Sequence, residues 1–249
     1  FTEIKQSLSN SFRFKEKTND YSYAMQIAAS LQHTPAEYVL SSAYEYQRFN
    51  PEVIQAVLDQ LTLDNARIFY IDKQQPGEQE MQYFAGNYSV HEISAELELK
   101  WQQNTEQFAL SLPRANGLMP ESFDLVSAKH INKPTQLVSE QGHTAHLGHS
   151  ALFKQPKGRV TLDLNSGLTK ASAKNHVLAN LLDRGLGQQL TELQSEAGAA
   201  GMGLGANLSN GLSLTASGFT DKQGLLLASA LKQIVEFDIS EDELANLKA

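Results

Sequence analysis

The sequence predicts an α+β fold in which helices pack on one face of a sheet rich in antiparallel strands. Three observations in the second half of the chain support this prediction. Residues 160–164 alternate apolar and polar side chains, as a half-buried strand does. The stretch 177–193 carries leucines at helical spacing, and Asn210-Gly211 joins two further alternating segments with a strong hairpin signal.

Capping residues predict three consecutive helices in the first third of the chain. Apolar residues recur at helical spacing over 21–31. Thr34 then supplies an N-cap hydroxyl, with a proline at the first helical position and a carboxylate that can bond back to the cap. Asn50-Pro51 repeats this chemistry before a third helical pattern that ends near Leu61.

Alternation and capping predict the remaining elements. Residues 66–71 are rich in β-branched and aromatic side chains and predict a strand, which needs a sheet to join. Beyond residue 123 we expect strands over 136–140, 143–153 and 160–164, a helix over 177–193, a hairpin of 201–208 with 212–219, a helix capped by Thr220 and Gln223 that runs through Val235, and a last helix with Ser240 and Glu243 in capping-box spacing. On the first hairpin strand, Gly201, Gly203 and Gly205 share one face, which indicates close packing of another backbone or helix rather than a ligand groove.

Composition excludes several classes of protein. The length of 249 residues suits one large domain or two of ordinary size. The apolar share of 41% is large enough for a hydrophobic core, and the charged share of 19% is too small for a disordered chain. A net charge of −8 disfavours nucleic acid and anionic membranes as partners. No run approaches the ~18 apolar residues that a membrane-spanning helix needs. Without cysteine there is neither a disulfide nor a thiolate zinc ligand.

The apolar period is lost between residues 100 and 123, where Pro113, Gly117 and Pro120 stand among polar residues. This composition predicts a linker and therefore the division 1–99, 100–123 and 124–249. We expect limited proteolysis to cut first in the linker. The chain starts at Phe1 and its last helix has little room before Ala249, so we expect an excerpt from a longer protein.

The histidine spacing predicts no metal site. On a strand, His146 would point away from His143 and His149, which would stand about 20 Å apart. His176 opens a predicted helix, but no glutamate and second histidine follow within the next turn. No G-x-S-x-G elbow is present either, so we expect no catalytic residue.

One basic stretch stands out against the acidic background. Arg13, Lys15 and Lys17 alternate with Phe12 and Phe14, so an extended segment would show three cations on one side and the rings on the other. Two interpretations are open: a solvated strand face with buried phenylalanines, and a patch that contacts anions or acidic peptides.

Several segments, in this order and spacing, resemble the insulinase-type (inverzincin) zinc metallopeptidases, the group of insulin-degrading enzyme and pitrilysin. They are residues 12–17, 34–40, 48–51, 61–68, Tyr83 and Tyr88 before 100–101, 112–113 with Asn116, and 218–223. The resemblance covers nearly the whole chain and rests on the order of these segments rather than on one motif.

The resemblance implies a zinc metalloendopeptidase with four homologous α+β domains in two halves that close around a peptide. This chain corresponds to the later part of the second domain, the linker between the halves and most of the third domain. The zinc motif H-x-x-E-H belongs to the first domain and is absent here. The resemblance therefore implies that this chain forms part of the chamber wall and the hinge, and that zinc is bound only elsewhere in the parent protein. It implies a peptide substrate and the other domains of the same polypeptide as partners. A periplasmic location is expected by analogy, and a cytoplasmic one stays open.

The alternative is a self-standing, non-proteolytic binding or assembly module of the same fold. A reading frame before Phe1 that encodes H-x-x-E-H would favour the peptidase, and an initiator methionine there would favour the module. We also expect the excerpt to form a homodimer through apolar faces and a strand edge near 66–71.

Overall fold

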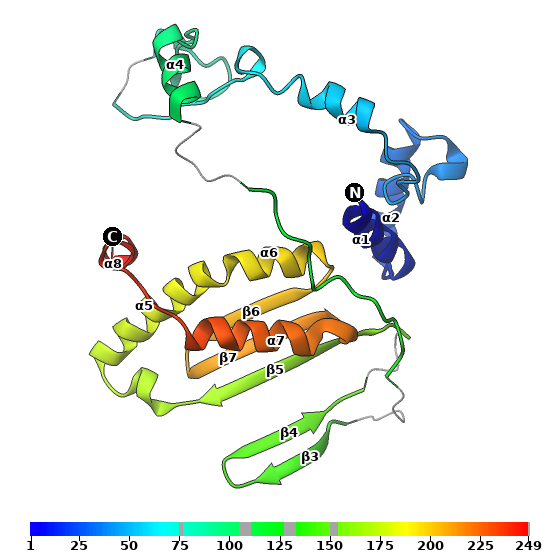
Figure 1. Ribbon diagram of the computed structural model, residues 1–249, viewed down its shortest axis with the longest axis vertical. Coiled ribbons are helices and arrows are strands. Elements are labelled where there is room, and N and C mark those ends of the chain that lie inside the picture. Colours follow the sequence, from blue (N-terminus) through cyan, green and yellow to red (C-terminus); the bar gives the residue numbers. More distant parts are fainter. Residues whose placement is uncertain (75–76, 105–110, 127–132, 150–153, 249) are drawn as a thin grey trace. The chain divides into compact units, whose positions relative to one another are not determined.

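The computed structural model describes residues 1–249 except 75–76, 105–110, 127–132, 150–153 and 249 (Figure 1). The helices are α1 (Thr2–Arg13), α2 (Asp20–Leu31), α3 (Pro51–Leu58), α4 (Ala95–Asn104), α5 (Ala173–Gln189), α6 (Thr191–Ala199), α7 (Thr220–Val235) and α8 (Glu241–Lys248), with short 3-10 turns η1 (Ala36–Tyr38), η2 (Leu63–Asn65) and η4 (Gly167–Lys170). The strands are β1 (Gln79–Glu80), β2 (Asn87–Tyr88), β3 (Thr135–Glu140), β4 (His143–Leu147), β5 (Lys157–Asn165), β6 (Gly203–Leu208) and β7 (Gly211–Phe219).

The chain divides into two compact units. The first unit contains Phe1–Gln47 and Ala115–Ala249, and the second contains Arg48–Arg114. This division follows contacts between residues, whereas the predicted boundaries 1–99, 100–123 and 124–249 follow the loss of the apolar period between residues 100 and 123, and they stay a prediction.

The largest described sheet belongs to the first unit and has the strand order β5-β7-β6, with antiparallel neighbours. The pairing of β6 with β7 confirms the predicted hairpin, in which Leu208 lies opposite Leu212. Gly211 ends the turn with a φ of +103°, a conformation that glycine adopts without steric cost.

One face of this sheet carries the core. Leu204, Leu214 and Ala216 lie on this face and pack with Leu190 between α5 and α6 and with Leu226 of α7. Figure 1 shows these helices alongside the sheet, and contacts of α5, α6 and α7 with its strands agree with that view. The predicted α+β fold with helices on one face of an antiparallel sheet is therefore confirmed.

Local capping predictions hold at two helices. The Asn50 side chain accepts a hydrogen bond from the backbone N–H of Val53 at 3.3 Å and begins α3. At α8, Ser240 and Glu243 form the reciprocal capping box, in which each side chain accepts from the other residue's backbone N–H. The predicted cap of α7 is wrong: Thr220 is the first helical residue, and its hydroxyl donates to the carbonyl of Pro156 instead.

Other predicted elements differ from the structure. The residues after Thr34 form the single 3-10 turn η1 and further turns rather than an α-helix, and no side-chain cap is present. The predicted helix 177–193 consists of two helices, α5 and α6, that meet at Leu190. Residues 66–71 form no strand, because a strand needs a neighbour for its backbone groups and none lies beside them in the second unit as described. Of the predicted strand 143–153, β4 covers His143–Leu147, and 150–153 lie outside the described residues.

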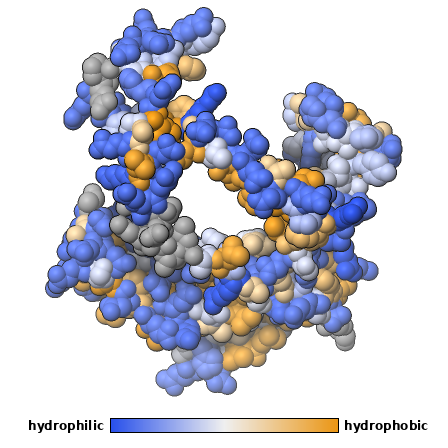
Figure 2. Space-filling view, turned by 45° about the horizontal axis from the view of Figure 1, so that its top comes forward, coloured by the Kyte–Doolittle hydropathy of each residue, from blue (hydrophilic) through white to orange (hydrophobic). Residues whose placement is uncertain are grey.

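The second unit exposes its apolar side chains. None of its described residues is buried, and Phe69 and Ile71 are 86% and 95% exposed. Figure 2 shows such apolar side chains in orange among the polar surface. Within the part of the chain that the structure describes, no helix has the length and apolar character needed to cross a membrane.

Candidate functional site

The three cations of the predicted basic patch lie in different surroundings. Arg13 is in the last turn of α1, not on an extended segment, and its guanidinium carbon lies 5.0 Å from the ring centroid of Phe14. The Lys15 ammonium lies 5.3 Å from the ring centroid of Tyr44, and the Lys17 ammonium lies 3.9 Å from Asp20. The extended geometry is wrong because apolar residues at 1, 4, 8 and 12 have helical spacing, and the helix runs to Arg13. The anion patch itself stays a prediction.

The sequence predicts that the histidines form no metal site. His143 and His146 lie on β4, and the His143 ring is paired with Glu140 at 3.3 Å. Across the described residues, no three histidine or acidic side chains cluster in a way that could hold a metal ion. The described residues therefore assign no ligands to a zinc ion, and the absence of a metal site in this chain stays a prediction.

Several polar contacts meet where residues 115–124, here called the anchored segment, cross the first unit. The predicted linker 100–123 includes most of this stretch, and Leu118 and Met119 are only 4% and 8% exposed and belong to the main core cluster. Pro120 is fully buried beside them. The segment is thus a structural part of the unit, and its polar groups need partners.

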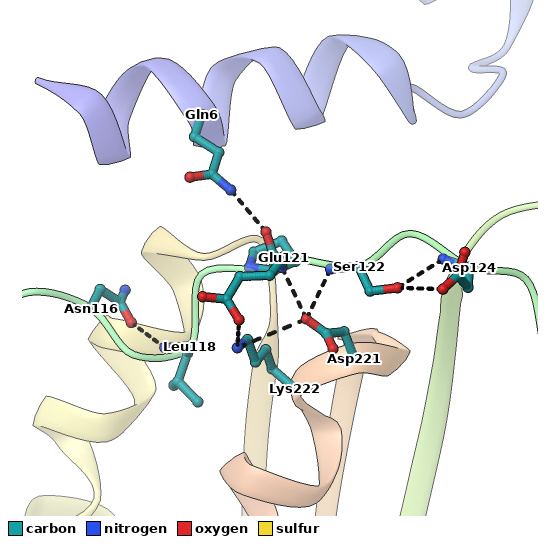
Figure 3. Close-up of polar contacts among 9 residues, drawn as sticks. Gln6, Asn116, Leu118, Glu121, Ser122, Asp124, Asp221 and Lys222 are labelled. Atoms are coloured by element: carbon teal, nitrogen blue, oxygen red, sulfur yellow. Dashed lines mark hydrogen bonds and ion pairs between the residues drawn. The ribbon is translucent and has the colours of Figure 1, made fainter.

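Helix α7 provides the first set of partners (Figure 3). One carboxylate oxygen of Asp221, Oδ2, accepts hydrogen bonds from the backbone N–H groups of Glu121 at 2.9 Å and Ser122 at 3.2 Å. The ammonium of Lys222 lies 2.8 Å from Glu121 Oε2 and 3.9 Å from Asp221 Oδ2. The Lys222 side chain is only 16% exposed, so its charge is compensated at a largely covered position.

These contacts shift two pKa values. The backbone N–H groups of Glu121 and Ser122 stabilise the ionised carboxylate and lower the pKa of Asp221, and the Lys222 charge adds to this. The hydrogen bond to Glu121 raises the pKa of Lys222. Both groups are therefore charged near neutral pH.

Helices α1 and α6 hold the same segment at other points. Gln6 of α1 donates to the carbonyl of Pro120 at 2.8 Å, and Glu3 accepts from the backbone N–H of Asn116 at 2.9 Å. The Asn116 amide donates in turn to the carbonyl of Glu196 at 2.7 Å. Side chains separated by about a hundred residues in sequence thus meet on one short segment.

An aromatic cluster closes the end of this segment. The rings of Phe14, Phe123 and Phe219 lie with centroids 5.2–5.5 Å apart, in tilted and edge-on arrangements that aromatic pairs favour. Phe14 follows α1, Phe123 belongs to the anchored segment and Phe219 ends β7. The cluster joins the three parts of the chain that the polar contacts also join.

A second surface lies on the side of the β5-β7-β6 sheet opposite the core. Here called the hydroxyl face, it consists of Thr161, Ser213, Thr215, Ser217, Gly203, Gly205, Arg159 and Asp163. Thr161 and Thr215 hydroxyls lie 3.1 Å apart, and Ser213 donates to Asp163 at 2.6 Å. The side chains of Arg159, Thr161 and Asp163 are exposed, so the face is accessible in the described part of the chain.

The glycines of β6 were expected to face a closely packed backbone or helix. A Cβ added to Gly205 would meet nothing within 4 Å, so this glycine opens onto free space. A Cβ at Gly203 would meet only the hydroxyl of Ser217, within its own sheet. The packing expectation is therefore wrong for these two positions in the described structure, and the apolar face of β6 is the packed one.

Comparisons with known proteins agree with this fold. The family described as the middle or third domain of peptidase_M16 matches residues 12–249. The chain belongs to the M16 peptidase family. It is 31% identical to Protease 3 of Salmonella typhimurium and 28% identical to insulin-degrading enzyme-like 2 of Arabidopsis thaliana, and each match covers 100% of this chain and 26% of the relative.

A solved structure places the fold in the same group. The crystal structure of pitrilysin matches with a TM-score of 0.75 and 29% identity, over 99% of this chain and 27% of that one. The predicted resemblance to a central segment of insulinase-type peptidases is therefore confirmed. The chain spans about a quarter of the length of its relatives, as the cited coverage shows.

The sequence identifies some residues of the anchored segment and of α7 only through the family resemblance, and it does not predict their contacts. Asn116 and the stretch 218–223 are among the residues that carry the resemblance, but neither spacing nor composition predicts that the anchored segment meets α7. One feature of the sequence could have drawn attention to Asp221: it is an acidic residue in the first turn of a predicted helix, where a carboxylate is favoured.

Proposed function

We propose that this chain is a non-catalytic segment of a zinc metalloendopeptidase that degrades peptides inside a closed chamber, and that it contributes chamber wall and hinge. Family membership and relatives named Protease 3 and insulin-degrading enzyme-like support a peptidase parent. In such a parent, zinc and its H-x-x-E-H ligands would lie outside this chain.

The observation that carries the wall function is the hydroxyl face. Serine and threonine hydroxyls both donate and accept hydrogen bonds, so they can pair with the N–H and carbonyl groups of a passing peptide whatever its side chains. The small residues Gly203 and Gly205 leave room for a chain to approach. A surface that is polar, open and free of large apolar side chains suits transient contact with many peptides.

The test uses the full-length parent with a bulky side chain on this face. Thr215→Trp should lower kcat/KM for a peptide substrate at least about threefold through KM, because the indole occupies space above the sheet, while zinc content is unchanged. Ala228→Trp, at an exposed position of α7, is the matched control and should have no effect. Equal kinetics of both variants and the parent would exclude this face from substrate contact.

A further inference from the structure

The anchored segment and the stretch 218–223 meet through Glu121 and Ser122 on one side and Asp221 and Lys222 on the other, and each of the two contains residues on which the family resemblance rests. One contains Asn116 of the anchored segment, and the other is 218–223, where β7 passes into α7. The wall function uses neither of them. The contacts of the anchored segment involve the consecutive residues 120–122, which indicates that they hold this part of the segment in place.

Two successive peptide groups of the anchored segment, 120–121 and 121–122, are held by side chains through three hydrogen bonds. The carbonyl of Pro120 accepts from Gln6, and the N–H groups of Glu121 and Ser122 donate to the single oxygen Oδ2 of Asp221 (Figure 3). Neighbouring residues offer similar backbone groups, but proline has no N–H, so a shift that placed Pro120 at the position of Glu121 would lose one of these bonds. Together with the buried side chains of Leu118, Met119 and Pro120, these bonds hold the segment in one position on the first unit.

Lys222 adds a charged contact from the next position of the same helix. Its ammonium bridges the Glu121 side chain and the Asp221 carboxylate, so the residue whose N–H is bound is also bound through its side chain. The Glu121 side chain is 81% exposed, whereas those of Asp221 and Lys222 are 24% and 16% exposed. The two helix residues are therefore the fixed partners, and the segment is attached to them.

We propose that Asp221 and Lys222 are positioning residues that clasp residues 120–122 to the start of α7, so that the anchored segment and the β5-β7-β6 sheet move as one block and the hinge of the parent lies before Ala115. This inference rests on the proposed function, since a hinge has a role only in an enzyme whose halves open and close. It divides the predicted linker 100–123 into a part that allows motion and an immobile part.

Hydrogen exchange on this chain tests the clasp without any activity measurement. In Asp221→Ala, peptides that cover 115–124 should exchange at least about tenfold faster, the factor expected for one lost charge-assisted hydrogen bond. Asp221→Asn keeps an acceptor and should restore part of the protection. Lys222→Met should accelerate the same peptides less, and Lys232→Met, an exposed lysine of the same helix, should leave them unchanged.

Two results would overturn the clasp. One is unchanged exchange over 115–124 in both Asp221→Ala and Lys222→Met. The other is an equal acceleration of the β7 core peptides, which would mean that these residues support general stability and not the segment. Because exchange does not depend on peptide cleavage, a failure of Thr215→Trp to alter kinetics would count against the wall function alone.

Discussion

Gly211 carries the turn between β6 and β7, and its backbone leaves no room for a side chain. Its φ is +103°, and an added Cβ would overlap the carbonyl oxygen of Leu164. We expect Gly211→Ala to lower the free energy of unfolding by about 2 kcal/mol or more, from backbone strain and displacement of β5. Urea denaturation measures this. Gly205→Ala is the control, because its Cβ would meet nothing, and a similar loss in both variants would contradict the explanation.

Asp221 makes stability depend on pH in a defined direction. Its pKa is lowered from the ordinary 3.8 by the backbone N–H groups of Glu121 and Ser122. A carboxyl group whose pKa is lower in the folded than in the unfolded state stabilises the folded state fully at pH values above its unfolded-state pKa. This stabilisation disappears as the pH falls through the folded-state pKa. The difference in unfolding free energy between the unchanged chain and Asp221→Asn should thus be largest near neutral pH and shrink below about pH 4. A difference that grows on acidification would refute this assignment.

At the scale of elements, Leu190 joins α5 to α6 and is fully buried in the core cluster. Leu190→Ala should lower the free energy of unfolding by about 2–5 kcal/mol, because it removes buried methyl groups and leaves a cavity where two helices meet the sheet. Leu178→Ala, at a side chain 52% exposed on α5, should cost less than about 1 kcal/mol. Denaturation of the two variants under identical conditions compares them, and equal losses would show that Leu190 is not a core residue.

For the molecule as a whole, the first prediction concerns metal. The purified 249-residue chain should hold no stoichiometric zinc and cleave no peptide, because the sequence has no H-x-x-E-H motif and its histidine spacings cannot assemble three ligands with a general base. Metal analysis after dialysis and a peptide cleavage assay check this. One tightly bound zinc per chain, lost in His143→Ala or His176→Ala, would prove the prediction wrong.

The second prediction at this scale concerns association. The second unit exposes Phe69 and Ile71 almost fully, and α3 exposes Val53 and Val57 at 59% and 61%. Such apolar surface favours self-association, while a net charge of −8 opposes unlimited aggregation. We expect this chain to form a small oligomer, most simply a dimer, in light scattering. A monomer at high concentration would show that these faces need no partner.

The sequence by itself determined those elements whose causes lie within a few residues. The Asn50 cap of α3, the Ser240–Glu243 box of α8 and the turn at Asn210-Gly211 each depend on neighbouring groups, and all three are present in the structure. The alternation of β5 and β7 likewise predicted a half-buried sheet, because side chains of a strand point to opposite sides of the sheet.

Only the tertiary structure decided which distant segments meet. The stretch 66–71 has strand-like composition, but no strand of the described residues pairs with it, and Leu118 and Met119 of the predicted linker are buried core residues. Asp221 and the amide of Glu121 are a hundred residues apart, and the residues next to Asp221 in the sequence do not indicate which N–H group its carboxylate binds. Caps and turns are settled by short-range sterics and hydrogen bonds, whereas the anchored segment is held by contacts that exist only after the sheet and helices have packed.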